Sequence, residues 1–75
     1  MAPPPISNTI RRLRFDHDEM TQQELAERVG VSRQTIISLE RGRYNPSILL
    51  AFRLAHQFGI PIESLFLYTE EDRDE

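Results

Sequence analysis

Residues 21–47 read TQQELAERVGVSRQTIISLERGRYNPS. Thr21 and Glu24 have the spacing of a capping box, in which a hydroxyl and a carboxylate each satisfy a free backbone amide at the start of a helix. Apolar residues then repeat on one helical face as far as Val29. Gly30 follows, and glycine commonly ends a helix because it adopts the left-handed backbone conformation at the least cost. The stretch therefore begins with a short helix that stops at Gly30.

A second helix follows almost at once, because Ser32 is a good N-cap. We expect this helix to run from Arg33 to Arg41, with Ile36 and Leu39 facing inward. Two short helices joined by so tight a turn cross steeply around one shared core, which leaves the outer face of the second helix free. The pattern predicts a helix-turn-helix whose second helix can enter a groove about 12 Å wide.

Further helices are predicted on both sides of this unit. Ser7 or Asn8 can cap a first helix, and the acidic segment 16–19 interrupts the apolar pattern as a loop. A fourth helix begins after Ser47, beyond a loop at residues 43–46. The apolar positions of the first and fourth helices are Ile10, Leu13, Leu50, Ala51, Leu54, Ala55 and Phe58.

Gly59 closes the fourth helix, and Pro61 starts a short fifth helix that buries Ile62, Leu65 and Phe66. Five helices with short connections predict a compact all-α domain over residues 7–68. Residues 1–6, with three consecutive prolines, are expected to form a flexible arm or a short strand. Residues 69–75 are expected to be a disordered acidic tail.

The outer face of the second helix of the pair carries side chains that suit DNA. Arginine can bond guanine through two hydrogen bonds and glutamine can bond adenine in the same way, while serine and threonine contact phosphate or the thymine methyl group. The residues offered there are Ser32, Arg33, Gln34, Thr35 and Ser38. Gln22 begins the preceding helix, where free amides and the helix dipole favour a phosphate.

The charge distribution agrees with a DNA-binding surface although the net charge is −3. Residues 69–75 hold five acidic residues and one arginine, so the rest of the chain carries a net charge of +1. Residues 28–53 hold five arginines and only one acidic residue, Glu40, which is a net charge of +4. The basic charge is therefore concentrated around the predicted helix-turn-helix.

The sequence resembles the Cro/repressor-type (xenobiotic-response-element) helix-turn-helix regulators, in particular their minimal single-domain subgroup. The likeness rests on Thr-Gln-x-Glu-Leu-Ala, Gly-Val-Ser-Arg-Gln-Thr-Ile and Glu-Arg-Gly-Arg-Tyr-Asn-Pro-Ser within residues 21–47, and it continues through LLAFRLAHQFGIPIESLF at residues 49–66. It implies a sequence-specific, double-stranded-DNA-binding transcriptional regulator, more often a repressor than an activator, that acts as a homodimer on a palindromic operator.

The resemblance also implies roles for individual residues. Those expected to contact bases are Arg33, Gln34 and Ser38. Those expected to contact phosphates are Gln22, Ser32, Arg41, Arg43, Tyr44 and Asn45, to which we add Thr35 for its hydroxyl. Arg41 and Arg43 are also expected partners of the helix dipole, being near a helix C-terminus. Arg14 and Glu40 match a structural ion pair. Ile37 departs from the pattern, since phage repressors often carry a polar contact residue there.

An apolar segment near the C-terminus suggests how two copies associate. A domain of this size can hardly bury all of it, so we expect it to contribute both to the core and to a dimer interface. Its residues are Ile62, Leu65, Phe66, Leu67 and Tyr68. The resemblance also allows residues 67–68 to pair with Ile6 as a two-stranded β-ribbon.

Other classes of protein find little support in the sequence. With no cysteine and only two histidines, 39 positions apart, it predicts no metal site or other cofactor. It shows no nucleophile–base pair or phosphate-binding glycine loop of an enzyme, no evident small-molecule site, and neither a signal peptide nor a membrane span. We therefore expect a soluble cytoplasmic protein that is not an enzyme. The alternative is an antitoxin-type protein-interaction module that also binds DNA.

Overall fold

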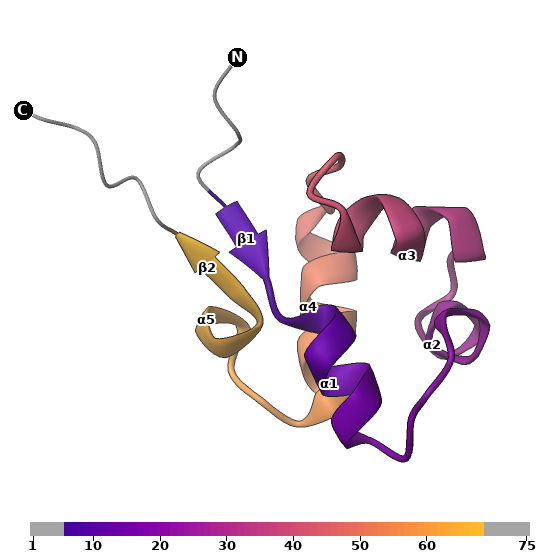
Figure 1. Cartoon of the computed structure of the whole chain (residues 1–75). Helices are drawn as coiled ribbons and strands as arrows, with labels where there is room; N and C mark the ends of the chain where they lie inside the picture. The colour runs from indigo at the N-terminus through magenta and orange to yellow at the C-terminus, as the bar shows by residue number, and fades with distance from the viewer. Residues whose placement is uncertain (1–5, 69–75) are drawn as a thin grey trace, which may run out of the picture.

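The computed structural model describes residues 6–68, and Figure 1 shows its helices joined by short connections, with a small β-ribbon formed by the two ends of this range. The elements in chain order are β1 (Ile6–Asn8), α1 (Ile10–Asp16), α2 (Gln22–Val29), α3 (Arg33–Glu40), α4 (Ile48–Phe58), α5 (Ile62–Leu65) and β2 (Phe66–Tyr68). The five-helix all-α fold with a terminal ribbon is thus confirmed.

The helix-turn-helix forms through the local signals expected of it. The Thr21 hydroxyl accepts a hydrogen bond from the Glu24 amide at 3.0 Å, and the Glu24 carboxylate accepts one from the Thr21 amide at 2.8 Å. Gly30 takes the left-handed conformation with a φ of 79°. The Ser32 hydroxyl then caps α3 by accepting from the amide of Thr35 at 3.2 Å. Helix α3 ends at Glu40, one residue earlier than predicted, with Arg41 as its C-cap.

The start of the chain differs from the prediction in detail. Ser7 does not cap α1, since the N-cap is Thr9, whose side chain makes no capping bond. The Asn8 side chain, one position earlier, accepts a hydrogen bond from the Ile10 amide at 3.2 Å. Asp16, predicted in the loop, is the last residue of α1.

The ribbon joins the two ends of the described chain. Strand β1 pairs antiparallel with β2, and Ile6 is opposite Tyr68 while Asn8 is opposite Phe66. The amide of Thr9 donates to the carbonyl of Leu65 at 3.0 Å, which continues the connection to the start of α1. Phe66 was expected inside the fifth helix, but it begins β2 and is only half-buried.

The core lies between the helices and determines which face of α3 is free. Its completely or almost completely buried large side chains are Ile10, Leu25, Ile36, Leu39, Leu54 and Leu65. Ile36 and Leu39 are the two that belong to α3. Each such side chain contributes roughly 1.5–3 kcal/mol relative to an exposed one. This burial fixes the orientation of α3 and leaves the opposite side of the helix on the surface.

The predictions for residues 1–5 and for the acidic tail, residues 69–75, lie outside the described residues. Within residues 6–68, none of the helices has both the length and the apolar character that a bilayer crossing requires.

Candidate nucleic-acid interface

Helix α3 presents its polar side outward. Figure 1 shows it along one edge of the molecule, crossing α2, which is seen nearly end on. Arg33 and Gln34 are exposed, whereas Ser38 is half-buried one turn further along. Since Ile36 and Leu39 hold the opposite side in the core, the three polar residues stay on or near the outer surface. The chemistry of this face matches direct contacts with base edges in a major groove.

Two hydroxyl groups at the start of α3 contact each other. The Ser32 and Thr35 oxygens lie 3.0 Å apart, and Ser32 also caps the helix through the Thr35 amide. Thr35 is half-buried and Ser32 is exposed. A hydroxyl has one donor and two acceptor positions, so these contacts leave bonding capacity for a phosphate at the exposed Ser32.

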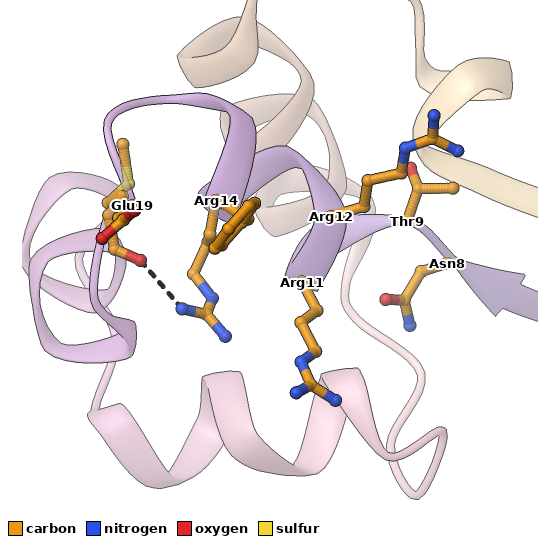
Figure 2. A pocket seen from close by; sticks show the side chains of 8 residues that line it. Asn8, Thr9, Arg11, Arg12, Arg14 and Glu19 are labelled. Atoms are coloured by element: carbon orange, nitrogen blue, oxygen red, sulfur yellow. Dashed lines mark hydrogen bonds between the residues drawn. The ribbon is translucent and has the colours of Figure 1, made fainter.

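A charged network joins α1 to the end of α3, and it contains the ion pair that the resemblance implied. The Nε atom of Arg14 lies 2.6 Å from Oε2 of Glu40, and its Nη2 atom donates to Oε1 at 3.1 Å. The third bond runs from Nη1 of Arg14 to the Met20 carbonyl at 2.8 Å, and is the dashed line in Figure 2. The side chains of Arg14 and Glu40 are only 14% and 9% exposed.

Gln22 belongs to the same network, which its position in the sequence did not indicate. Its Nε2 atom donates to Oε1 of Glu40 at 3.1 Å, and the residue is half-buried at the start of α2. Sequence reasoning assigned Gln22 to a phosphate only. In the structure its side chain is oriented by Glu40, which leaves the carbonyl oxygen and one N–H of the amide for other partners.

A polar hollow of about 640 Å³ lies over this network, between α1, the start of α2 and α3. Its lining residues are Arg11, Arg14, Glu19, Met20, Thr21, Gln22, Arg33, Ile37, Glu40 and Arg41. Four guanidinium groups and two carboxylates give it a net charge of +2. The ion pairs within residues 6–68 are Arg14 with Glu40 and Arg12 with Asp16, so Arg11, Arg33 and Arg41 have no carboxylate partner there.

Arg11 is a residue that sequence reasoning missed. It comes from α1, outside the helix-turn-helix, yet it lines the same hollow as Arg33 and Arg41 of the α3 region. The signal available in the sequence was the run Arg11-Arg12-Leu13-Arg14, in which one arginine had a structural partner and the other two had no assigned role.

The loop after α3 is held by backbone hydrogen bonds to that helix. The amide of Arg43 donates to the Ser38 carbonyl at 2.9 Å, and Gly42 has a φ of 71° that lets the chain turn. The four loop residues assigned to phosphates, Arg41, Arg43, Tyr44 and Asn45, are all exposed. Arg41 lines the hollow, whereas the other three do not.

The apolar C-terminal segment divides between core and surface. Leu65 is completely buried and packs in the core of the single chain, and its part in a dimer interface stays a prediction. Ile62 and Phe66 are half-buried. Leu67 is 39% and Tyr68 is 66% exposed on the ribbon, beside Ile6 at 40%. The ribbon is thus the exposed part of this segment.

A second apolar surface lies at the start of α4 and was not anticipated. Ile48 is 77% and Leu49 is 60% exposed, and Phe52, one turn later, is 58% exposed. Apolar residues outside the inward stripe of a helix were the sequence signal for it.

Among the described residues, no three His, Asp or Glu side chains lie close enough together to hold a metal ion.

Comparison with known proteins agrees with this geometry. The helix-turn-helix family model matches residues 10–65. An uncharacterized HTH-type transcriptional regulator of Methanocaldococcus jannaschii is 45% identical over 67 residues, which are 89% of this chain and 100% of that protein. The cryptic phage CTXphi transcriptional repressor RstR of Vibrio cholerae is 35% identical over 70 residues, which are 93% of this chain and 62% of that repressor.

A solved structure shows the same fold. The restriction-modification controller protein C.AhdI from Aeromonas hydrophila superimposes with a TM-score of 0.65 and 29% identity, over 73% of this chain and 82% of that one. These relatives are named as regulators of transcription or controller proteins and not as enzymes. The chain therefore belongs to the helix-turn-helix family of Cro/repressor (xenobiotic-response-element) type, and it is a DNA-binding transcriptional regulator.

Proposed function

We propose that the protein is a homodimeric, sequence-specific repressor that binds a palindromic operator in double-stranded DNA. The observation that carries this proposal is the outer face of α3, where Arg33 and Gln34 are exposed next to a hollow with a net charge of +2. A groove-binding helix needs base-specific donors and acceptors on its surface and positive charge beside it for the phosphates. Binding is its activity, and we propose no catalytic role and no cofactor.

The roles of the side chains follow from their chemistry and position. Arg33 and Gln34 contact base edges, and Ser38 contacts a base one turn on. The residues that hold the phosphates are Gln22, Ser32, Thr35, Arg41, Arg43, Tyr44 and Asn45. Phosphate contacts place the helix in the groove, and base contacts select the sequence. Ile37 of α3 is half-buried, and its side chain can contact a thymine methyl group.

The second copy is proposed to pack against the ribbon. Leu67 and Tyr68 of β2 are exposed together with Ile6 of β1, which makes an apolar surface on the two-stranded ribbon. An exposed apolar surface on a small domain commonly marks a contact with another protein. A twofold dimer on this surface would set two α3 helices into successive major grooves, with half-sites about 34 Å apart. Residues 7–68 would then serve both DNA binding and dimerisation.

Repression is proposed because the regulators similar to this chain include named repressors, among them RstR and the immunity repressor of Bacillus phage phi105. A protein that occupies an operator can block transcription without any further surface, whereas activation requires a contact with the transcription machinery. We place this activity in the cytoplasm, where a prokaryotic cell holds its DNA.

Selection of bound duplexes from a random DNA pool tests the proposal. We expect the full chain to recover a palindrome whose two halves are centred about 10–10.5 base pairs apart. Binding to it should weaken steeply between 50 and 200 mM salt, because phosphate contacts release counterions. Recovery of no preferred sequence, or of a site without two-fold symmetry, would contradict the proposal.

A further inference from the structure

We propose that Arg11 of α1 binds a phosphate of the DNA backbone and thereby adds a contact outside the helix-turn-helix. This inference rests on the proposed function, because it supposes that α3 enters the major groove. It adds to that function a direct contact between α1 and DNA. This contact would raise the affinity for DNA without a preference for any base sequence.

The position of Arg11 on α1 is fixed by its neighbours. Ile10, the residue before it, is completely buried in the core, and Arg14, one turn later, is bonded to Glu40 of α3. Because these two residues are held by their contacts, α1 cannot rotate about its own axis. Figure 2 shows the side chains of Arg11 and Arg12 on different sides of α1, with Arg11 extending on the side of α3. In agreement with this view, Arg11 lines the hollow that contains Arg33 and Arg41, and Arg12 does not.

No contact within the described residues gives the guanidinium of Arg11 a structural role. Its side chain makes no ion pair or hydrogen bond within residues 6–68, whereas Arg14 makes three hydrogen bonds and Arg12 lies 3.9 Å from Asp16. The residue is exposed, so the charge is solvated in the free protein. A solvated guanidinium at the rim of a positive hollow can bind an anion without breaking any internal bond.

Phosphate fits this position better than a base does. Glu40, which lines the hollow, is bonded to Arg14 and Gln22, and the side chains proposed to contact bases come from α3. Arg11 comes from α1 and not from the recognition helix, so we place it against a DNA strand that borders the groove. A guanidinium matches the geometry of a phosphate through two parallel hydrogen bonds. Among the lining residues, Glu19 is the one carboxylate outside an ion pair. Three arginines of the lining are also outside ion pairs, so positive charge prevails in the hollow.

The test compares Arg11→Gln with Arg12→Gln in the full chain. Each variant removes one positive charge from an exposed side chain of the same helix, but only Arg11 lines the hollow. Binding is measured by fluorescence anisotropy on the duplex obtained by selection and on a random duplex, at several salt concentrations. For Arg11→Gln we expect a loss of about fivefold to tenfold on both duplexes and a fall of about 2 in the slope of log K against log salt, about 1 for each copy of Arg11 in the dimer.

The matched control should separate a local contact from a general effect of charge. Arg12→Gln should leave the salt slope unchanged and lower affinity by less than about twofold, since its weak surface pair contributes little. Both variants should unfold at the midpoint of the wild type. Replacing single phosphates of the duplex by neutral methylphosphonates should reveal one position in each half-site at which the wild type loses affinity and Arg11→Gln loses none further.

Two results would overturn the inference. Equal salt slopes for the two variants would show that Arg11 contributes only general charge. A loss confined to the selected duplex would make Arg11 a base contact instead of a phosphate contact. Failure of the proposed function is distinguishable from both, because the wild type itself would then show no sequence preference or no salt-dependent binding.

Discussion

Arg14 of α1 and Glu40 at the end of α3 form an ion pair through two hydrogen bonds, 2.6 and 3.1 Å long, across 26 positions of sequence. Because both side chains are largely buried, the pair ties the recognition helix to a part of the molecule outside the helix-turn-helix. It also orients Gln22 of α2 through the same carboxylate. One acidic side chain thus links the three helices that surround the positive hollow.

Loss of this carboxylate should destabilise the fold. For Glu40→Ala we expect a decrease of about 3 kcal/mol in the free energy of unfolding, because the buried guanidinium of Arg14 loses its partner. Urea denaturation followed by circular dichroism measures this change. The control Glu27→Ala removes an exposed carboxylate that bonds only Gln23, and it should change stability by less than about 0.5 kcal/mol. A similar small effect for Glu40→Ala would contradict a structural role of the pair.

The capping box of α2 should contribute measurably to stability. Thr21→Ala removes the hydroxyl that accepts from the Glu24 amide, and we expect a loss of about 1 kcal/mol. Thr21→Ser keeps this oxygen and should recover most of the loss. Both changes in the free energy of unfolding are calculated from the midpoints of urea denaturation, with the same denaturant slope m for all variants. If serine were no better than alanine, the hydroxyl bond would not be the source of the effect.

Arg33 and Arg43 should differ in how their loss affects DNA binding. Arg33→Ala should cost about 1–3 kcal/mol on the operator and relax the preference at one base pair, because it removes a base contact. Arg43→Ala should weaken binding to all sequences alike and reduce the salt slope by about 2, about 1 for each copy in the dimer. Quantitative binding to the operator, to single-base variants and to random DNA distinguishes the two patterns. Equal losses of Arg33→Ala on operator and random DNA would exclude a base contact.

The ribbon should be the site of dimerisation. Leu67→Glu places a charge on the exposed ribbon, and we expect it to shift the protein toward monomer in sedimentation equilibrium, since an unpaired charge in an apolar interface is costly. Leu49→Glu makes the same change on the exposed start of α4 and should leave the dimer intact. Dissociation by Leu49→Glu alone would move the interface to α4, and a monomeric wild type would contradict a dimer altogether.

The local elements of the fold could be predicted because each depends on neighbouring residues. A capping box needs only Thr21 and Glu24, and the tight turn needs a glycine that takes a positive φ at position 30. The alternation of buried and exposed residues in α3 follows from a period of 3.6 residues. The polar face that carries Arg33 and Gln34 could therefore be recognised before the fold was known, although the roles of these residues in DNA binding remain predictions.

The sequence by itself thus determined the helices, the caps of α2 and α3, the turn between these two helices, and the polar outer face of α3. Only the tertiary structure decided that Gln22 bonds Glu40, that Leu65 is enclosed while Leu67 is exposed, and that Arg11 stands at the same hollow as Arg33. The physical reason is that a cap or a helical face depends on residues a few positions apart. Burial and side-chain partners depend instead on which distant helix covers a residue, and no local pattern records that.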